Sequence, residues 1–307
     1  MKFGVLLHAD RGVHAVMEEA KLADDQGFDS VWLGDHIMNQ AAPLDSFTLM
    51  TAIGASTDRV RLAWSMLNVN FRYPAVLAKV LATLDQITEG RVICSIGSGS
   101  NPAEHVAYNI PVEQDHDARV QHTREVVQLL KELWTHPAPA MTTFMGQQVQ
   151  VKDLAFGPEP YQKPNPPIWL GGESDSTLQI VKDLADGWVT LTRDAAHPNL
   201  APVTDVVASA LAAPDWPSRA MTVVLGIRIF VASKHEDAVA EAKTALGETF
   251  GRFGEIVGTP DECLERIAEL EQVGVNYLRT TCAGVRQQEA IADLLLGRVS
   301  QVALQGA

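Results

Sequence analysis

The chain has few cysteines, and no two of them stand at metal-binding spacing. Cys94, Cys263 and Cys282 are scattered over 307 residues, so neither a disulfide framework nor a structural zinc site is expected. The sequence also lacks HExxH and any histidine pair at ligand spacing, which are the usual signatures of zinc enzymes. We therefore expect no metal site, and three unpaired thiols are typical of the reducing cytoplasm.

Long apolar runs and an excess of positive charge are also missing. The first twelve residues contain too short an apolar run for a signal peptide, and no segment approaches the length of a membrane span. The 24 Lys and Arg residues against 38 Asp and Glu give a net charge of −14. Such a charge repels the phosphate backbone of nucleic acids. We expect neither a nucleic-acid partner nor a membrane partner.

What the sequence does contain is a repeated alternation of strand-like and helix-like segments. Hydrophobic residues make up 46% of the chain and charged residues 20%, enough for a large core. The expected strands span residues 3–8, 29–36, 60–68, 91–97, 166–172, 186–191, 221–233 and 275–282. Helical spacing of apolar residues predicts helices between them, at residues 14–27, 46–56, 74–90, 118–134, 176–185, 236–246 and 260–273.

Strict alternation of strands and helices predicts parallel strands joined by right-handed crossovers. Eight such units in about 300 residues favour a (β/α)8 TIM barrel that forms one domain over residues 1–307. An open doubly wound sheet is the alternative, because periodicity does not show closure. Residues 136–167 are rich in proline and contain a hairpin-like stretch at 142–151, so we interpret them as an insertion between units four and five. Residues 193–217 form a second, weaker irregularity.

A barrel carries its chemistry on the loops that follow the carboxyl ends of its strands. This rule selects His8, Asp35, His36 and residues 65–68, 98–101, 171–174, 190–193 and 279–281. Each has a structural interpretation as well: His8 alone is more often a hydrogen-bonded histidine without chemistry, and Asp35 is a suitable helix cap. Residues 171–174 suit a tight turn, but glycines before a helix start also favour binding of a phosphate.

The glycine-rich stretch Gly97–Ser100 does not match the common nucleotide-binding motifs. "GSGSNP" is not GxGxxG, and the chain has no Walker loop, which disfavours a Rossmann dinucleotide site.

Five segments that follow one another along the chain are familiar in combination. They are "GFDSVWLGDHI", residues 71–111, "PPIWLGG", "LADGW" and "VGTPDECLERIAELEQVGVNYL". Together they resemble the luciferase-like monooxygenase superfamily, over nearly the whole chain from Phe3 to about Cys282. The resemblance implies a TIM barrel with an insertion, and a reduced flavin or the deazaflavin F420 bound at the carboxyl end of the barrel.

The resemblance also assigns roles to individual residues. It implies a non-proline cis peptide bond at Ser65–Met66, or one bond to either side, with Asn68 just after it at the edge of the cofactor ring. It makes Gly97–Ser100 a cofactor loop. The residues implied to contact the cofactor are Ser65, Met66, Asn68, Ser98, Gly99, Ser100, and, around its phosphate, Gly171, Gly172, Glu173 and Ser174.

The choice between FMN and F420 stays open at this point. "DHI" and "SMLNVNFRYP" are similar to the F420 branch, which includes F420-dependent glucose-6-phosphate dehydrogenases. Two residues depart from that subgroup, since Gln40 stands where its substrate-side tryptophan is expected and Ser100 where an acidic residue is expected. The acidity of the chain also does not favour the anionic tail of F420.

We expect a redox enzyme in which reduced FMN oxygenates a small organic substrate, with a flavin reductase as a supplier of the reduced cofactor. The alternatives are an F420-dependent hydride transfer and a flavin-binding barrel without catalysis. A hydrolase or aldolase would need a strand-end lysine or paired carboxylates, and neither stands out. His36 is the expected acid–base residue, because histidine titrates near neutrality, and His8 assists from the opposite side. Asp35 either orients His36 or points away from it.

A homodimer is the expected assembly. Luciferase-like barrels commonly pair through helices of the amino-terminal half, and two expected helices there carry apolar stripes. The stripes consist of Phe47, Leu49, Met50, Leu77, Leu81 and Leu84. The alternative is that these stripes face the barrel, as in any helix that follows a strand.

Overall fold

The computed structural model describes residues 1–38, 43–99, 101–111, 113, 115–191, 203–251, 254–282 and 284–305. Ser100, which the resemblance assigns to the cofactor, and Gln40 lie outside the described residues.

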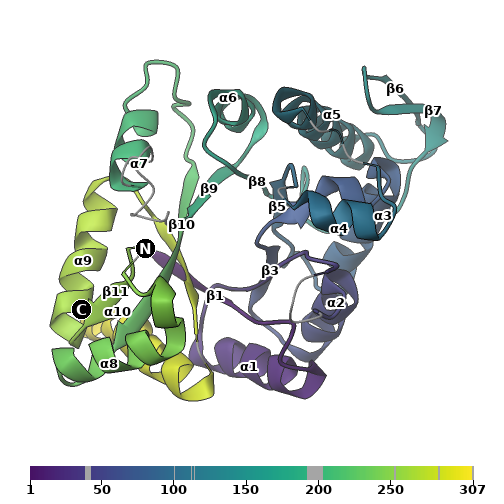
Figure 1. The fold of residues 1–307 in the computed structure, drawn as a ribbon. Helices are drawn as coiled ribbons and strands as arrows, with labels where there is room; N and C mark the ends of the chain where they lie inside the picture. The colour runs from purple at the N-terminus through teal and green to yellow at the C-terminus, as the bar shows by residue number, and fades with distance from the viewer. Residues whose placement is uncertain are drawn as a thin grey trace.

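Parallel strands form a barrel, as the alternation of segments predicts (Figure 1). The barrel strands are β1 (Lys2–Leu6), β2 (Ser30–Leu33), β3 (Arg61–Trp64), β4 (Leu67–Asn68), β5 (Cys94–Gly97), β8 (Ile168–Gly171), β9 (Gly187–Leu191), β10 (Thr222–Val231) and β12 (Tyr277–Thr281). Their order around the sheet is β3-β2-β1-β12-β10-β9-β8-β5-β4. Because β3 and β4 follow each other along the chain, the two ends of this path meet, and a parallel bridge between Leu62 and Val92 joins them.

Two details of the sheet differ from the sequence-based expectation. The expected third strand, residues 60–68, is divided into β3 and β4, and the peptide bond between Ser65 and Met66 at the division is cis. The resemblance therefore places this bond correctly. A short additional strand, β11 (Ile256–Gly258), pairs with β10 outside the path of the barrel.

Helices surround the strands. They are α1 (Val13–Gln26), α2 (Ser46–Ser56), α3 (Pro74–Ile87), α4 (Pro102–Ala107), α5 (His116–Thr135), α6 (Asp175–Leu184), α7 (Val203–Leu211), α8 (His235–Leu246), α9 (Pro260–Gln272) and α10 (Val285–Gln305), with 3-10 turns η1 (Val69–Phe71) and η2 (Gly247–Thr249). In Figure 1, α1, α2, α3 and α5 lie on one side of the strands and α8, α9 and α10 on the other. The seven helices expected from the sequence are confirmed, whereas α4, α7 and α10 were not among the expected ranges. Helix α7 lies in the stretch expected to be irregular.

The interior of the barrel is filled at its amino-terminal end. Trp32 and Trp169 approach each other with ring centroids 5.7 Å apart, and Tyr277 lies 5.3 Å from Trp169. Arg61 reaches over the Trp169 ring, with its guanidinium carbon 5.6 Å from the ring centroid, and binds Asp29. Because aromatic rings occupy this end, we look for a ligand site inside the barrel at its carboxyl end, where the strand-end loops meet.

The insertion contains the expected hairpin. Strands β6 (Met141–Met145) and β7 (Gln150–Ala155) pair antiparallel between α5 and β8, and in Figure 1 they project beyond α5. The buried Glu125 of α5 fixes the turn, because its carboxylate accepts the backbone N–H groups of residues 147–149 at 2.8–3.0 Å. These hydrogen bonds hold the hairpin against α5.

The apolar stripes that suggested a dimer surface turn inward. All six side chains, from Phe47 to Leu84, are buried within the chain itself, so helices α2 and α3 use these stripes to cover the strands. They offer no surface to a second copy. Among the described residues, no helix is both long and apolar enough to span a membrane.

Candidate active site at the carboxyl end of the barrel

His36 at the end of β2 is held by a carboxylate that the sequence analysis did not select. Glu104 lies in α4, whose start is fixed by Asn101, since the Asn101 side chain accepts the N–H of Ala103 at 3.2 Å. The distance from His36 Nδ1 to Glu104 Oε1 is 2.7 Å. The backbone N–H of Ile37 donates to Glu104 Oε2 at 2.9 Å, and Asn101 Nδ2 donates to Oε1 at 2.8 Å.

The charge of Glu104 decides the orientation of His36. Glu104 is only 1% exposed. Burial by itself would raise the pKa of Glu104, but the hydrogen bonds from His36 and Ile37 outweigh it and hold this pKa below its usual range. A carboxylate that is ionised at neutral pH only accepts hydrogen bonds, so Nδ1 of His36 carries the proton. Nε2 then remains at the exposed side of the ring, and the side chain of His36 is 48% exposed.

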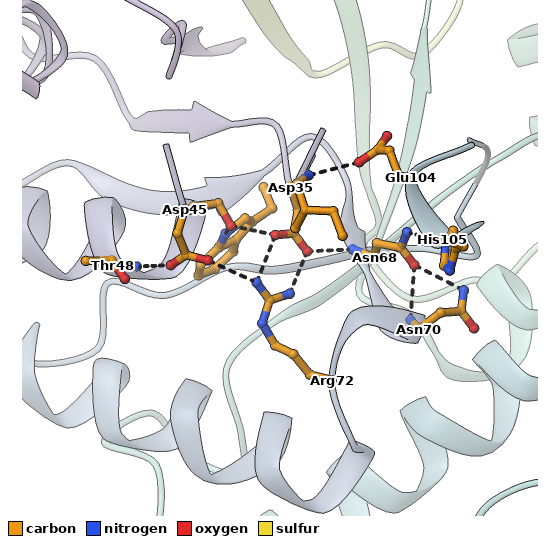
Figure 2. A network of polar contacts seen from close by, with 11 residues as sticks. Asp35, Asp45, Thr48, Asn68, Asn70, Arg72, Glu104 and His105 are labelled. Atoms are coloured by element: carbon orange, nitrogen blue, oxygen red, sulfur yellow. Dashed lines mark hydrogen bonds and ion pairs between the residues drawn. The ribbon is translucent and has the colours of Figure 1, made fainter. Parts of the chain in front are cut away.

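Asp35 faces the opposite direction, into the layer between barrel and helices. Figure 2 shows the network around its carboxylate. Arg72 binds both oxygens, at 2.8 and 3.1 Å, while the Ser46 hydroxyl donates at 2.6 Å and the Asn68 backbone N–H at 3.0 Å. Of the two alternatives for Asp35, pointing away from His36 is therefore the one the structure has. Its role is to tie α2 and η1 to the end of the third strand.

Asn68 is part of a second network of side chains (Figure 2). Its Nδ2 lies 3.2 Å from His105 Nε2, and its Oδ1 accepts two hydrogen bonds from Asn70, at 3.0 and 3.1 Å. Asn70 Nδ2 in turn donates to the backbone oxygen of Ser98 at 2.9 Å. Gly99 fits against this network with φ +77°, and a Cβ there would lie 2.8 Å from Asn68 Oδ1. The network thus fixes the predicted cofactor loop and requires glycine at position 99.

Met66, which follows the cis bond, packs between two other strand ends. A Cβ at Gly97 or at Gly171 would lie 2.9 Å from the Met66 side chain. Met66 and Gly171, both predicted cofactor contacts, therefore share one surface with Gly97 at the end of β5. The glycines have a packing reason to be there, namely to make room for Met66.

The predicted phosphate-binding turn follows β8. Gly172 has φ +128°, a conformation that favours glycine, and a Cβ there would meet Thr177 Cγ2 at 2.9 Å. The Ser174 hydroxyl accepts the backbone N–H of Thr177 at 3.3 Å and so caps α6. Glu173 turns away from the helix start and accepts the Thr190 hydroxyl. A substituent at position 172 would thus collide with Thr177, rather than only obstruct a phosphate.

His8, the second predicted catalytic residue, lies between two hollows at the mouth. One, of about 200 Å³, is lined by His8, His36 and Ser65, and the other, of about 330 Å³, by His8 and Arg228 among others. Burial lowers the pKa of His8, and the positive charge of Arg11 lowers it further. His8 is therefore a neutral imidazole at pH 7, and it connects the two hollows.

Another cavity, of about 830 Å³, lies outside the barrel mouth. Residues 69–75, 109–111 and 148–151 line it together with His122 and Leu129. It contains neither His8 nor His36 and opens between α3, α5 and the hairpin. We place the chemistry at the smaller hollows, because the two predicted histidines meet only there.

The residues at the mouth fit a flat ring with a phosphate-bearing tail. Glycines at 97, 99 and 171 keep the ends of β5 and β8 free of side chains, and Ser65 opens onto the hollow that contains His36. The start of α6 offers backbone N–H groups, which attract a phosphate. Ser65, Met66, Ser98 and Gly99 would hold the ring, and residues 171–174 the phosphate.

A comparison with protein families identifies the family of this chain. A family model described as luciferase-like monooxygenase matches residues 1–251. This chain belongs to that family. The predicted resemblance is confirmed, and with it the prediction of an oxidoreductase or monooxygenase.

Individual relatives of this luciferase-like chain are named for both of the cofactors that the sequence predicts. An F420-dependent glucose-6-phosphate dehydrogenase of Microbacterium testaceum is 31% identical over 62% of this chain, and the match spans only 56% of that relative's length. A 5,10-methylenetetrahydromethanopterin reductase of Archaeoglobus fulgidus is 26% identical over 91% of this chain and 92% of its own. An FMNH(2)-dependent dimethylsulfone monooxygenase of Pseudomonas putida is 26% identical over 76% of this chain and 72% of its own.

A solved structure supports the fold. The monooxygenase RslO1 of Streptomyces bottropensis superimposes with a TM-score of 0.79, covering 97% of this chain and all of that one at 21% identity.

Proposed function

We propose that this chain is an oxidoreductase in which reduced FMN or F420 acts on a small organic substrate while His36 transfers the accompanying proton. The observation that carries the proposal is the 2.7 Å contact between His36 Nδ1 and the buried Glu104. A histidine fixed in this way presents Nε2 as a base, or as an acid when protonated. Reduced F420 would supply a hydride, and reduced FMN would supply the electrons that activate O₂.

Each part of the mouth has a task in this scheme. Glu104 fixes the tautomer of His36, as a buried carboxylate does for catalytic histidines elsewhere. The Asp35–Arg72 pair keeps the end of the third strand in place beneath the ring. His8, neutral at pH 7, is a hydrogen-bonding group on the opposite side of the substrate rather than a second acid. A non-catalytic flavin carrier would not need the open Nε2.

The test has two steps. Titration of the chain with FMN, FMNH₂ and F420, followed by ring absorbance, identifies the cofactor, and a substrate screen then compares FMNH₂ under O₂ with F420H₂ without it. His36→Ala should leave cofactor affinity within a few-fold and lower turnover by roughly 10²–10⁴, the usual worth of a general acid or base. The matched control is His235→Ala, since His235 Nδ1 also binds a carboxylate, Glu262, at 3.0 Å but belongs to an outer helix. Normal turnover in His36→Ala would refute its role, and no binding of any cofactor would refute the function.

The partners and location that accompany this function are proposals as well. An FMN-dependent enzyme needs a flavin reductase that supplies FMNH₂, and we propose a cytoplasmic location because the three cysteines are buried and free. We still propose a homodimer, but with a different contact surface from the one expected from the sequence. This surface consists of large apolar side chains that are exposed at the start of α3 and the end of α4, namely Tyr73, Val76, Val106 and Tyr108.

A further inference from the structure

A cluster of arginines lies on the side of His8 that faces away from His36. Arg228 of β10 and Thr281 of β12 are partners in the parallel register and both line the hollow of about 330 Å³. Arg279 precedes Thr281 by two residues, so it points to the same face of the sheet. Its positive charge acts on both Arg228 and His8, which line the hollow.

Two of the three arginines in this cluster are paired with a carboxylate. Arg11 Nη1 lies 2.6 Å from Glu19 Oε1, and Arg228 Nη1 lies 3.9 Å from Glu255 Oε1. For Arg279, no carboxylate or hydrogen-bond partner is found among the residues that the structure describes, and its Nε is buried without a partner. Asp10 stands at the rim, where it is exposed to water.

Arg279 is built into the barrel rather than lying on its surface. The residue is 6% exposed, and its register partners on both neighbouring strands are glycines, Gly4 and Gly226. Burial lowers the pKa of Arg279 to about 10, and Arg228 contributes to this shift. The guanidinium is still charged at pH 7, and a buried charge without a partner is costly. The fold therefore maintains one uncompensated positive charge directly beneath the mouth.

We propose that the substrate of this enzyme carries a carboxylate, which binds to Arg279 and Arg228 while its reacting carbon lies toward His36. The position of the reacting carbon near His36 rests on the proposed function, whereas the carboxylate site at Arg279 and Arg228 does not. One uncompensated charge calls for a monoanion, and a carboxylate matches the planar fork of a guanidinium. His8 lines both hollows, so a molecule with its acid group in the arginine hollow reaches the hollow of His36 and Ser65.

The experiment measures anion binding to the full chain without cofactor. Propanoate, propane-1-sulfonate, inorganic phosphate and the neutral propanamide are titrated at constant ionic strength, with intrinsic tryptophan fluorescence as the readout. Propanoate should bind with a Kd on the order of 1 mM, within the limits for so small a ligand, and propanamide at least tenfold more weakly. Arg279→Met should weaken propanoate binding at least tenfold, whereas Arg279→Lys, which keeps the charge, should retain part of it.

Arg61→Met is the matched control, because Arg61 lies at the amino end of the same barrel and binds Asp29; it should leave propanoate binding unchanged. If Arg279→Met fails to fold, by circular dichroism, Arg228→Gln takes its place with the same expectation. Equal binding of propanoate and propanamide, or unaltered binding in the variant, would overturn the site. A preference for inorganic phosphate, which carries more charge, would overturn the carboxylate assignment. Cofactor titrations are read separately, so a chain that binds propanoate but no cofactor would contradict only the proposed function.

Discussion

The half-buried Arg72 and the buried Arg279 should respond to the same substitution in opposite ways. Arg72 holds Asp35 with two hydrogen bonds and lies over the Phe47 ring, 4.2 Å from its centroid. Arg279 has no such partner among the described residues. We predict that Arg72→Met destabilises the ligand-free chain and that Arg279→Met stabilises it.

The magnitudes follow from the pairing of each guanidinium. Removing Arg72 leaves the Asp35 carboxylate, itself only 1% exposed, with two neutral donors, and breaking a buried pair costs about 3–5 kcal/mol. Removing Arg279 relieves the desolvation of an unpaired ion but loses part of its packing, for a net gain of about 1–3 kcal/mol. A chain of 307 residues unfolds with an entropy of about 0.6 kcal/mol/K. Arg72→Met should thus lower Tm by about 5–8 °C and Arg279→Met raise it by about 2–5 °C.

The assay is scanning calorimetry in Tris chloride, without carboxylate, sulfonate or phosphate, because a bound anion would stabilise only the parent chain. Adding propanoate should then raise Tm of the parent and leave Tm of Arg279→Met unchanged. An Arg279→Met variant that melts several degrees below the parent in this buffer would refute the reasoning, since it would mean that Arg279 already has a partner within the chain.

Three further outcomes follow from the same geometry. Glu104→Gln should cost about 2–4 kcal/mol at pH 7, since a buried acceptor of charge-assisted hydrogen bonds is lost. Because the pKa of Glu104 is lowered in the folded chain, its contribution is complete above the ordinary Glu value of about 4.3 and disappears as pH falls through the folded pKa; a difference between the urea midpoints of variant and parent that did not shrink as pH fell below that value would contradict this. Gly171→Ala should displace Met66, whose side chain lies 2.9 Å from the new Cβ, and weaken cofactor binding by roughly tenfold or more, as judged by ring absorbance. Gly297→Ala, where no atom lies within 4 Å of the new Cβ, is its control and should bind normally. Sedimentation should give twice the mass of the 33.3 kDa chain, and Tyr73→Lys should shift it toward the monomer; a parent chain that sediments as a monomer at micromolar concentration would refute the dimer.

The barrel and most of its elements could be predicted from the sequence, because a strand or helix is encoded in a short continuous segment. The strand-end rule then selected His8 and His36 without any structure. The rule does not give direction, however. Asp35 and His36 are neighbours on an extended segment and face opposite sides, so the carboxylate adjacent in sequence belongs to the packing layer. Only the contacts of Asp35 with Ser46 and Arg72 decide between the two alternatives.

Glu104 could not be found in this way, because its contact with His36 spans 68 residues. The segment that carries Glu104 is a six-residue helix, too short for a periodic signal. The proline after Asn101 is a helix-start signal, and it was available in the sequence. The apolar stripes show the converse difficulty. A helix that covers a barrel and a helix in a dimer have the same pattern, and only the burial of Leu77 and Leu81 within the chain distinguishes them.

The buried charged groups Asp35, Glu104 and Arg279 differ in how fully the chain itself compensates them, and this difference separates structure from function. Asp35 has Arg72, and Glu104 has His36 together with backbone donors, so these groups are satisfied before any ligand arrives. For Arg279, no carboxylate partner is found among the described residues, and its Nε is buried without a hydrogen bond. The chain as a whole carries −14, but salt screens exposed charges over about 8–10 Å, whereas a buried guanidinium is screened much less. The local charge of Arg279 therefore determines the sign of the ligand, and the overall acidity of the chain does not.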